Sequence, residues 1–368
     1  MIIQDTSLTR RSFTRGAGIA AAAMTVPSFS YAAGDTKVLR IRTYTDMKTL
    51  EPGDAAFDDM TVMLPIFNSP IRYKVGEDVR NWEFVPDIAE ELEWVDNTHC
   101  KFRLKTGIAW TNGFGELTAE DLKFSYERIA NPENNFAYLS DWDSLDTVEL
   151  VDSHSGVIVL KEPNVLVKSL TLGLGRSTIV CKAAVEQAGG RFTTDPIATS
   201  GPYQIRSWTP SQKVSLERNP LWSGDKPDFD EIYLIPIPDA NTASLAFDAG
   251  EVDITNIGES LAANYRDNPK EGTRLQIREL VGIEWLGINV DHPQFQDERV
   301  RRAVQLAVDV DQILEGSFLG LAPRANGLVS TGLVGHRDSN LYPERDVAQA
   351  RELLGEAGLP DGFKATLP

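Results

Sequence analysis

The side chains that could do chemistry in this chain are few and widely separated. Its four histidines are His99, His154, His292 and His336, and none has the spacing of a metal-ligand pair or of a catalytic triad. His99 adjoins Cys100, but neighbouring residues on a strand point to opposite faces of the sheet. The sequence contains no nucleophile elbow, phosphate-binding loop or CxxC motif. It therefore gives no positive indication of an enzyme, and it predicts neither a cofactor nor a metal.

The segment from Tyr138 to Trp142 has the residue types of a binding surface. Tyr138 and Trp142 supply aromatic rings, and Asp141 supplies a carboxylate next to them. Rings and a carboxylate together suit a cationic ligand or a peptide. Core packing is the alternative for the two rings, because large aromatic side chains are often buried.

The elements around these residues follow a regular order from Asp195 to Ile254. Ser200-Gly201-Pro202 predicts a turn, because glycine tolerates unusual backbone angles and proline fixes φ. Three strands are expected after it. Asp239 is the expected N-cap of a helix over 240–249, and a further strand should follow that helix.

Helices are predicted elsewhere from capping residues and apolar spacing. The sequence Thr118-Ala119-Glu120-Asp121 predicts a capped helix start, and Leu122, Tyr126 and Ile129 then mark one helical face. Further helices are expected at residues 58–67, 86–92, 297–315 and 346–357.

Three motifs in the stretch from Asp195 to Ile254 resemble the extracellular solute-binding proteins of family 5. They are TSGPY (Thr199 to Tyr203), ERNPLWSGDKP (Glu217 to Pro227) and PDANTASLAFDAGEVDI (Pro238 to Ile254). Similar motifs occur in the same order in that family, which contains the dipeptide-, oligopeptide- and nickel-binding subunits of ABC importers. The resemblance extends from Val38 to Gly362.

The resemblance implies an α/β fold, the two-lobed periplasmic binding protein (type II-like) with mixed sheets flanked by helices. The first lobe is expected at residues 33–285, with a core subdomain of residues 33–68 and 196–285 and an inserted subdomain of residues 69–195. Residues 286–368 would begin a second lobe that is incomplete, because family members continue well beyond this point. The chain is therefore expected to be a truncated form or a fragment.

The resemblance also indicates ligand contacts. In peptide-binding members the strand–helix connection near the mature N-terminus faces the cleft between the lobes, and it corresponds here to residues 52–61. Phe57, Asp58 and Thr61 are therefore candidate contacts, beside Tyr138 and Trp142. The alternative is that Asp58 caps its helix and that the others are ordinary surface residues.

A second candidate region begins at Ile283. Residues 283–289 resemble the family's strand that crosses from one lobe to the other, so the hinge is expected at Leu286, Gly287, Ile288 and Asn289. Trp285 precedes this hinge, where its side chain could line the cleft or pack against the lobe.

The first 32 residues predict an export leader. Arg10 and Arg11 precede a short, alanine-rich run over residues 16–26, and Ser30-Tyr31-Ala32 has small residues where a signal peptidase cleaves. The layout is typical of a twin-arginine signal, and an ordinary secretory leader is the alternative. The run is too short to span a bilayer, which needs about 20 residues. We therefore expect release into the periplasm.

The chain is strongly acidic, with a formal net charge of −18 over 368 residues. This charge argues against nucleic acid and anionic membranes as partners. Cys100 and Cys181 could pair in an oxidising compartment, or they could be buried separately as small apolar side chains.

Together these observations predict a soluble, non-enzymatic, monomeric substrate-binding component of an ABC importer. Its expected partners are a small-molecule or peptide ligand and the permease subunits in the inner membrane. A di- or oligopeptide is the first expectation for the ligand, and a nickel chelate, an opine or an oligosaccharide are the alternatives. A periplasmic hydrolase, chaperone or sensor would be an interpretation from another class.

Overall fold

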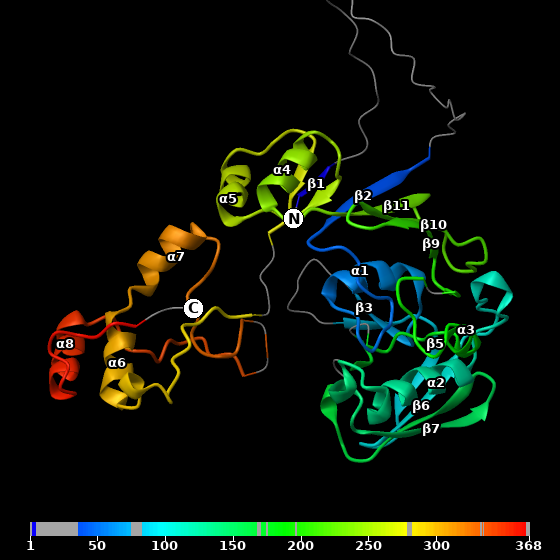
Figure 1. Cartoon of the computed structure of the whole chain (residues 1–368), viewed down its shortest axis with the longest axis horizontal. Helices are drawn as coiled ribbons and strands as arrows, with labels where there is room; N and C mark the ends of the chain where they lie inside the picture. Colours follow the sequence, from blue (N-terminus) through cyan, green and yellow to red (C-terminus); the bar gives the residue numbers. More distant parts are fainter. Residues whose placement is uncertain are drawn as a thin grey trace, which may run out of the picture. The chain divides into compact units, whose positions relative to one another are not determined.

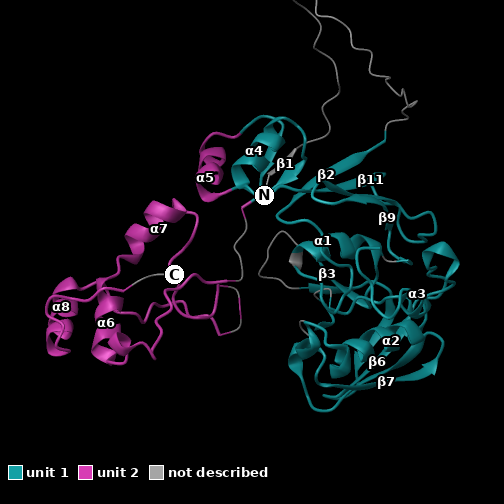
Figure 2. Ribbon diagram, viewed as in Figure 1, with its two compact units in different colours: residues 1–74, 83–257, 270–276 teal, residues 75–82, 258–269, 277–368 magenta. Residues whose placement is uncertain are grey.

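The computed structural model describes residues 2–4, 36–74, 83–167, 171–173, 176–195, 197–277, 282–331, 333 and 335–365, without the side chains of residues 2–4 and of Phe57. The chain divides into two compact units, coloured separately in Figure 2. Unit 1 consists of residues 1–74, 83–257 and 270–276, and unit 2 of residues 75–82, 258–269 and 277–368. The lobe and subdomain boundaries expected from the sequence stay predictions.

Unit 1 contains a mixed seven-stranded sheet (Figure 1). Its strand order is β13-β1-β12-β2-β11-β10-β9. The strands are β1 (Ile2–Gln4), β2 (Val38–Thr43), β9 (Tyr203–Thr209), β10 (Lys213–Arg218), β11 (Glu231–Pro236), β12 (Ile254–Thr255) and β13 (Thr273–Leu275). β2 runs parallel to both β11 and β12, and the other pairs are antiparallel. The predicted series of three strands, a helix and a strand after the Ser200-Gly201-Pro202 turn is confirmed, with α4 (Ala240–Asp248) between β11 and β12.

β1 lies within the segment that the sequence predicts as an export leader. It pairs antiparallel with both β12 and β13. Arg10 and Arg11, with the rest of that segment, lie outside the described residues. The leader therefore stays a prediction.

Two smaller sheets complete unit 1. The larger has the order β5-β6-β8-β7 with every pair antiparallel, and the smaller is a hairpin of β3 and β4. The strands are β3 (Ile71–Lys74), β4 (Glu83–Pro86), β5 (Ala89–Trp94), β6 (His99–Leu104), β7 (Leu145–Asp152) and β8 (Ser155–Leu160). The helix predicted at residues 86–92 is wrong. Leu92 instead pairs with Phe102 of β6, and this tertiary pairing decides a short segment whose own pattern suits either structure.

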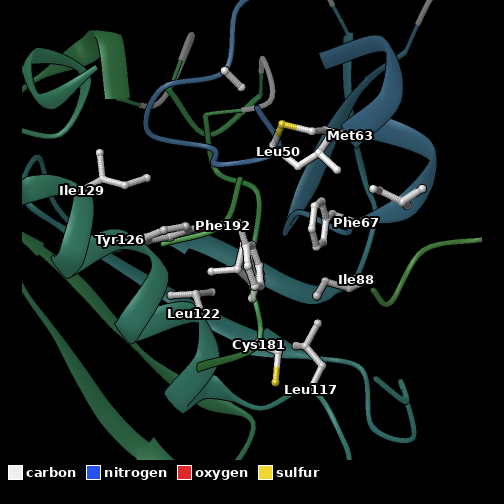
Figure 3. Packing of buried hydrophobic residues seen from close by; sticks show 14 of the residues in the cluster. Leu50, Met63, Phe67, Ile88, Leu117, Leu122, Tyr126, Ile129, Cys181 and Phe192 are labelled. Carbon is white, nitrogen blue, oxygen red and sulfur yellow. The ribbon is translucent and has the colours of Figure 1, made fainter. Parts of the chain in front are cut away.

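The core of unit 1 is built by three helices packed with these sheets (Figure 3). They are α1 (Phe57–Ile66), α2 (Ala119–Ala130) and α3 (Lys182–Gln187). Leu122, Tyr126 and Ile129 of α2 are all buried, which confirms the predicted face. Phe67, which follows α1, stacks on Phe192 with ring centroids 6.5 Å apart.

The capping box predicted at Thr118 and Asp121 is present. Asp121 has two further contacts, since its carboxylate accepts hydrogen bonds from Trp110 Nε1 (3.2 Å) and from the Lys182 amide (2.9 Å). It therefore connects the start of α2 to the start of α3. Cys100 and Cys181 are not joined by a disulfide and both are buried, as in the second alternative, and burial raises the pKa of Cys181.

The family motifs occupy positions that hold this unit together. The Asp253 carboxylate accepts from the Arg40 amide (2.8 Å), from Nε (2.9 Å) and from Nη2 (2.7 Å), which joins β2 to the start of β12. Asn219 Nδ2 donates to the Gly201 carbonyl (2.8 Å). A Cβ on Gly201 would lie 2.6 Å from the Pro65 carbonyl oxygen, so only glycine fits at this turn. These motif residues are structural.

Unit 2 contains α5 (Glu259–Asp267), α6 (Glu298–Ala307), α7 (Val310–Phe318) and α8 (Val347–Glu356). The single helix predicted at residues 297–315 is wrong, because Val308 has an extended backbone and Asp309 caps a second helix by accepting from the Gln312 amide (3.0 Å). The helix predicted at 346–357 is confirmed as α8, with Asp346 as its cap.

Residues 283–289 do not form the expected strand; their backbone is irregular. Short 3-10 helices also occur at Thr111–Gly113, Pro132–Asn134, Leu139–Asp141 and Pro293–Phe295. Within the described ranges, no helix is long and apolar enough to cross a membrane.

Candidate functional site

The first turn of α1 is fixed to the chain that precedes it by two neighbouring carboxylates. Asp58 Oδ2 accepts from the amide (2.9 Å) and the hydroxyl (2.7 Å) of Thr45. Asp59 accepts from the Ala56 amide (2.9 Å), as the capping-box residue, and from the Lys48 amide (2.7 Å). Asp58 therefore clamps the connection between β2 and α1 and does not cap the helix. Thr61, one turn later, is half-buried, and the side chain of Phe57 lies outside the described residues.

Trp142 does not have the surface that a ligand contact requires. It is 1% exposed, and its ring stacks on Tyr126 with centroids 4.2 Å apart. Its indole Nε1 donates to the Arg176 carbonyl (3.1 Å). The expectation of a ligand contact at Trp142 is corrected accordingly: the large ring packs in the core, and its one polar atom is satisfied by the backbone.

Arg176 connects two of the segments predicted to contact ligand. Its Nη1 donates to the Ala55 carbonyl (2.8 Å), and its guanidinium carbon lies 3.3 Å from the centroid of the Tyr138 ring. Nε is 3.4 Å from Asp141 Oδ2. The Tyr138 amide in turn donates to the Gly53 carbonyl (3.0 Å). Residues 52–61 and 138–142 therefore meet, and we call Ala55, Tyr138, Asp141 and Arg176 the Arg176 cluster.

The chemistry of the Arg176 cluster suits an anion that also has a flat or apolar part. The Arg176 side chain is 20% exposed, and its Nη2 has no hydrogen-bond partner among the described residues. A guanidinium stacked on a tyrosine keeps a fixed plane, in which its Nη2 can donate a charge-assisted hydrogen bond to a ligand carboxylate. The Asp141 side chain, 36% exposed, supplies a negative charge next to the guanidinium.

Sequence reasoning missed Arg176. The available signal was its isolation, because it is the single charged residue between positions 169 and 181. An arginine in such a run is costly to bury without partners. This signal predicts a paired arginine, but it does not identify the partners, which lie more than thirty positions away.

A second group of polar side chains lies where the parallel strands end. Tyr44 directly follows β2, and its hydroxyl accepts from Asn256 Nδ2, which follows β12 (2.9 Å). The Arg42 guanidinium lies 4.1 Å from the Tyr44 ring centroid and donates to the Ile237 carbonyl (2.8 Å), just after β11. Ligands of open α/β sheets bind outside the carboxyl ends of the strands. Tyr44, which is 44% exposed, is therefore a further candidate contact that sequence reasoning missed.

The predicted hinge residues Leu286, Gly287, Ile288 and Asn289 belong to unit 2, together with Trp285. Trp285 is 74% exposed, so it does not pack in the core of that unit. Leu286 is 50% exposed. The hinge assignment stays a prediction.

His154 has partners that the sequence did not reveal. His154 lies within hydrogen-bond distance of Ser153 Oγ through Nδ1 (2.9 Å) and of Glu116 through Nε2 (3.0 Å). Glu116 also accepts from the Gly107 amide, which is the main reason that its pKa is lowered. These contacts tie the turn between β7 and β8 to the loop before α2, which is a structural role. In the part of the chain that is described, no group of three or more His, Cys, Asp and Glu is placed to hold a metal.

A cavity of about 450 Å³ in unit 1 is apolar and lies between the β3–β4 hairpin and β5. Ile71, Phe84 and Trp94 are among the residues that line it, and none of the predicted contacts with a described side chain does.

Residues 83–367 match the sequence pattern of the bacterial extracellular solute-binding proteins, family 5 (middle region). The chain belongs to this family. The resemblance carried by the three motifs is thereby confirmed, and so is the α/β fold class of two-lobed periplasmic binding proteins that it implied. The match covers most of the described residues, including the Arg176 cluster apart from Ala55.

Several family 5 proteins and related structures are similar to this chain. GsiB, a glutathione-binding protein of Salmonella paratyphi A, is 28% identical over 271 residues, which cover 72% of the chain and 51% of that protein. The solved structure of MoaA from A. tumefaciens R10 with mannopinic acid is 27% identical, with a TM-score of 0.70 over 89% of the chain and 66% of that structure. DppA of Helicobacter pylori with the peptide STSA has a TM-score of 0.71 at 21% identity, over 89% of the chain and 67% of that structure, and shows the shared fold. The chain spans about half the length of the curated relatives it matches.

Proposed function

We propose that the protein is the periplasmic substrate-binding component of an ABC importer and that Arg176 binds a carboxylate of its ligand. The observation that carries this proposal is the Arg176 cluster, in which a guanidinium is stacked on Tyr138 and has one nitrogen without a partner among the described residues. Membership of family 5 supports the carrier role. A carrier needs a site that binds and releases without chemical change, and the cluster contains no group poised to attack a ligand.

A di- or oligopeptide is the ligand class that we favour. Glutathione, the peptide STSA and mannopinic acid, named with the similar proteins, all carry carboxylates, which is the group that the cluster suits. In a peptide complex, Asp141 is placed to attract a ligand amine while Arg176 takes a carboxylate. An opine is the second candidate, because the MoaA structure is similar to this chain at 27% identity.

The decisive experiment measures binding by the full-length protein. Calorimetric titration with dipeptides, tripeptides, glutathione and mannopinic acid should give one class that binds, and mass spectrometry should recover that ligand unaltered. Arg176→Gln should weaken binding about tenfold or more, the loss of one charge-assisted contact. Arg103→Gln is the matched control, because Arg103 is exposed on β6 and pairs loosely with Asp152 at 3.9 Å.

A ligand with its carboxylate converted to an amide completes the test. The wild type should lose affinity for the amide, whereas Arg176→Gln should bind acid and amide alike. Equal loss in both proteins would show that Arg176 does not contact the carboxylate. Chemical conversion of the ligand during the titration would contradict the carrier role and indicate a hydrolase instead.

Export and delivery belong to the same proposal. Residues 1–32 would act as a twin-arginine leader, and the mature monomer would deliver its ligand to permease subunits in the inner membrane. Changing Arg10 and Arg11 to lysine should abolish export, measured by fractionation of the periplasm. Unchanged export would contradict the twin-arginine route and favour an ordinary secretory leader.

A further inference from the structure

A buried ion pair lies directly before the segment that carries Gly53 and Ala55. Arg128 on α2 donates from Nη1 and Nη2 to the two carboxylate oxygens of Glu51, each at 2.7 Å. The Glu51 side chain is completely buried and that of Arg128 is 6% exposed. Glu51 also accepts from the Phe192 amide (3.2 Å), and Arg128 donates to the Gly190 carbonyl (3.0 Å). Both charges are therefore well satisfied, and the pair joins three separate parts of unit 1.

Phe136 lies between this ion pair and a second one. Its ring centroid is 5.0 Å from the Arg128 guanidinium and 4.2 Å from that of Arg191. Arg191 pairs with Asp54 at 3.0 Å, and Asp54 accepts from the Ala137 amide (3.0 Å). The two arginines therefore hold the ring by cation–π contacts, while their acidic partners flank Gly53.

Gly53 contacts both Phe136 and Tyr138, and so connects the two ion pairs to Tyr138. A Cβ on Gly53 would lie 2.5 Å from Phe136 Cδ1, so the ring packs directly on the glycine backbone. The Gly53 carbonyl accepts from the Tyr138 amide (3.0 Å). Tyr138 is the residue on which Arg176 stacks. A continuous set of contacts thus runs from the Glu51–Arg128 pair through Phe136 and Gly53 to the Arg176 cluster.

We propose that Glu51 and Arg128 are positioning residues, which fix Tyr138 and Arg176 in the geometry that binds the ligand. The inference rests on the proposed function for its ligand, but the contacts on which it depends are independent of any ligand. Buried ion pairs contribute little net stability, because desolvation offsets their attraction. Their bidentate geometry instead specifies position, and a site whose groups are already in place binds without the cost of ordering them.

Arg128→Lys is the first test, because lysine keeps the charge but cannot make two parallel hydrogen bonds to Glu51. Gly53→Ala is the second, because it moves Phe136 without removing a charge. In the ligand-free protein, we expect hydrogen exchange at the amides of Ala137 and Tyr138 to become about tenfold faster in both variants. Ligand affinity should fall by about the same factor. Ile158→Ala, at a buried position of β8, is the control for general destabilisation and should change neither quantity, measured on folded protein.

Each outcome decides between the two proposals. Unchanged exchange at Ala137 and Tyr138 in the variants would overturn the positioning role, whatever the ligand is. Faster exchange with unchanged affinity, while Arg176→Gln still weakens binding, would also overturn it and leave the proposed function intact. If the wild type binds no ligand, the proposed function fails, and the exchange measurement alone decides whether Arg128 orders this segment. Should Arg128→Lys not fold, Gly53→Ala provides both measurements.

Discussion

Unit 1 and unit 2 differ in how much apolar surface each one buries. Unit 1 has a continuous core that includes side chains from α1, α2, α3 and the two larger sheets, and Ile71 of the β3–β4 hairpin packs against it. A small core cluster of unit 2 consists of Ala303, Leu306 and Ala350, with Leu353 and Leu354 packed against it. Leu328 (80% exposed), Trp285 (74%) and Leu341 (68%) of unit 2 face solvent.

This difference explains why the candidate site can be argued from unit 1. The Arg176 cluster is built on helices and loops whose other faces are buried, so its geometry is set by many contacts. The predicted hinge and Trp285 lie in a unit with few buried contacts of its own. Local stability increases with the number of buried contacts. Side chains in unit 1 should therefore be held in fixed positions, and the backbone amides of unit 2 should exchange their hydrogens more readily.

The largest effect should come from matched core substitutions. Leu122→Ala in α2, at a completely buried position, should cost about 2–5 kcal/mol of unfolding free energy. Leu306→Ala in α6 should cost about 2 kcal/mol or less, because a small core can collapse around the lost methyl groups. Urea unfolding followed by circular dichroism gives both values, and equal costs would remove the difference between the units.

Hydrogen exchange shows where each of these costs falls. Leu122→Ala should speed exchange across α1, α2 and β6, whereas Leu306→Ala should affect α6 and α8. A loss of protection in α2 on changing Leu306 would show that the two units unfold as one.

A smaller effect is expected for the ion pair behind a family motif. Asp253→Asn should cost about 2 kcal/mol, because Asp253 is 4% exposed and accepts charge-assisted hydrogen bonds from Arg40. The bond to Asp253 is also the main reason that the pKa of Arg40 is raised. Asp248→Asn is the control within unit 1, since Asp248 and Lys270 are both 45% exposed, and it should cost less than about 0.5 kcal/mol. Thermal unfolding at two salt concentrations measures the stability lost in each variant. Equal losses for Asp253→Asn and Asp248→Asn would contradict the structural role of the motif.

Local chemistry explains which parts of the fold were predictable from sequence. The turn at Ser200-Gly201-Pro202 and the helix caps Asp239 and Asp346 were found, because glycine, proline and aspartate act on their own backbone neighbours. Residues 86–92 were wrongly assigned to a helix, because the strand at residues 89–92 depends on pairing with β6, which the local sequence does not show. The break between α6 and α7 was missed, since Asp309 reads equally well as a mid-helix residue and as a cap.

The site was predictable only in part, for the same reason. Residues 52–61 and 138–142 were singled out separately, and the sequence did not show that they meet. Arg176, which brings them together, comes from a third segment. Trp142 and Tyr138 are the same kind of residue four positions apart, and only their contacts show that one is buried against Tyr126 while the other faces Arg176.

Each unit has a helix that is capped by an aspartate, so the same substitution can be made in both units and its effects compared. Asp346→Ala removes the hydrogen bond to the Gln349 amide (2.9 Å) and should cost about 1 kcal/mol. Asp239→Ala removes the same kind of bond, to the Thr242 amide (2.7 Å), in unit 1. Because unit 2 has the smaller core, exchange should increase along the whole of α8 in the first variant and only in the first turn of α4 in the second. The reverse pattern would show that unit 2 is the more cooperative of the two.

The smallest effect is a pH dependence confined to unit 1. Glu127 Oε1 accepts from Lys123 Nζ (2.7 Å), from the Val148 amide (2.9 Å) and from Thr147 Oγ1 (2.8 Å), which joins α2 to β7. Burial raises the pKa of Glu127, but these hydrogen bonds outweigh it, and the pKa in the folded protein is lowered. The stabilisation is therefore complete above the unfolded value of about 4.3 and is lost as the pH falls through the lower folded value.

Glu127→Gln isolates this contribution, because every other carboxylate is common to both proteins. The variant should be less stable than the wild type by about 0.5 kcal/mol at pH 7, since the pair with Lys123 is partly exposed and screened. The difference should shrink as the pH falls below the unfolded value of about 4.3, because the unfolded chain and then the folded wild type become protonated at this carboxylate. Urea midpoints at pH 7, 5 and 3 measure it. A difference that stays constant over this range would mean that the charge of Glu127 is irrelevant and that its hydrogen bonds alone join α2 to β7, in which case the packing of unit 1 owes nothing to this ion pair.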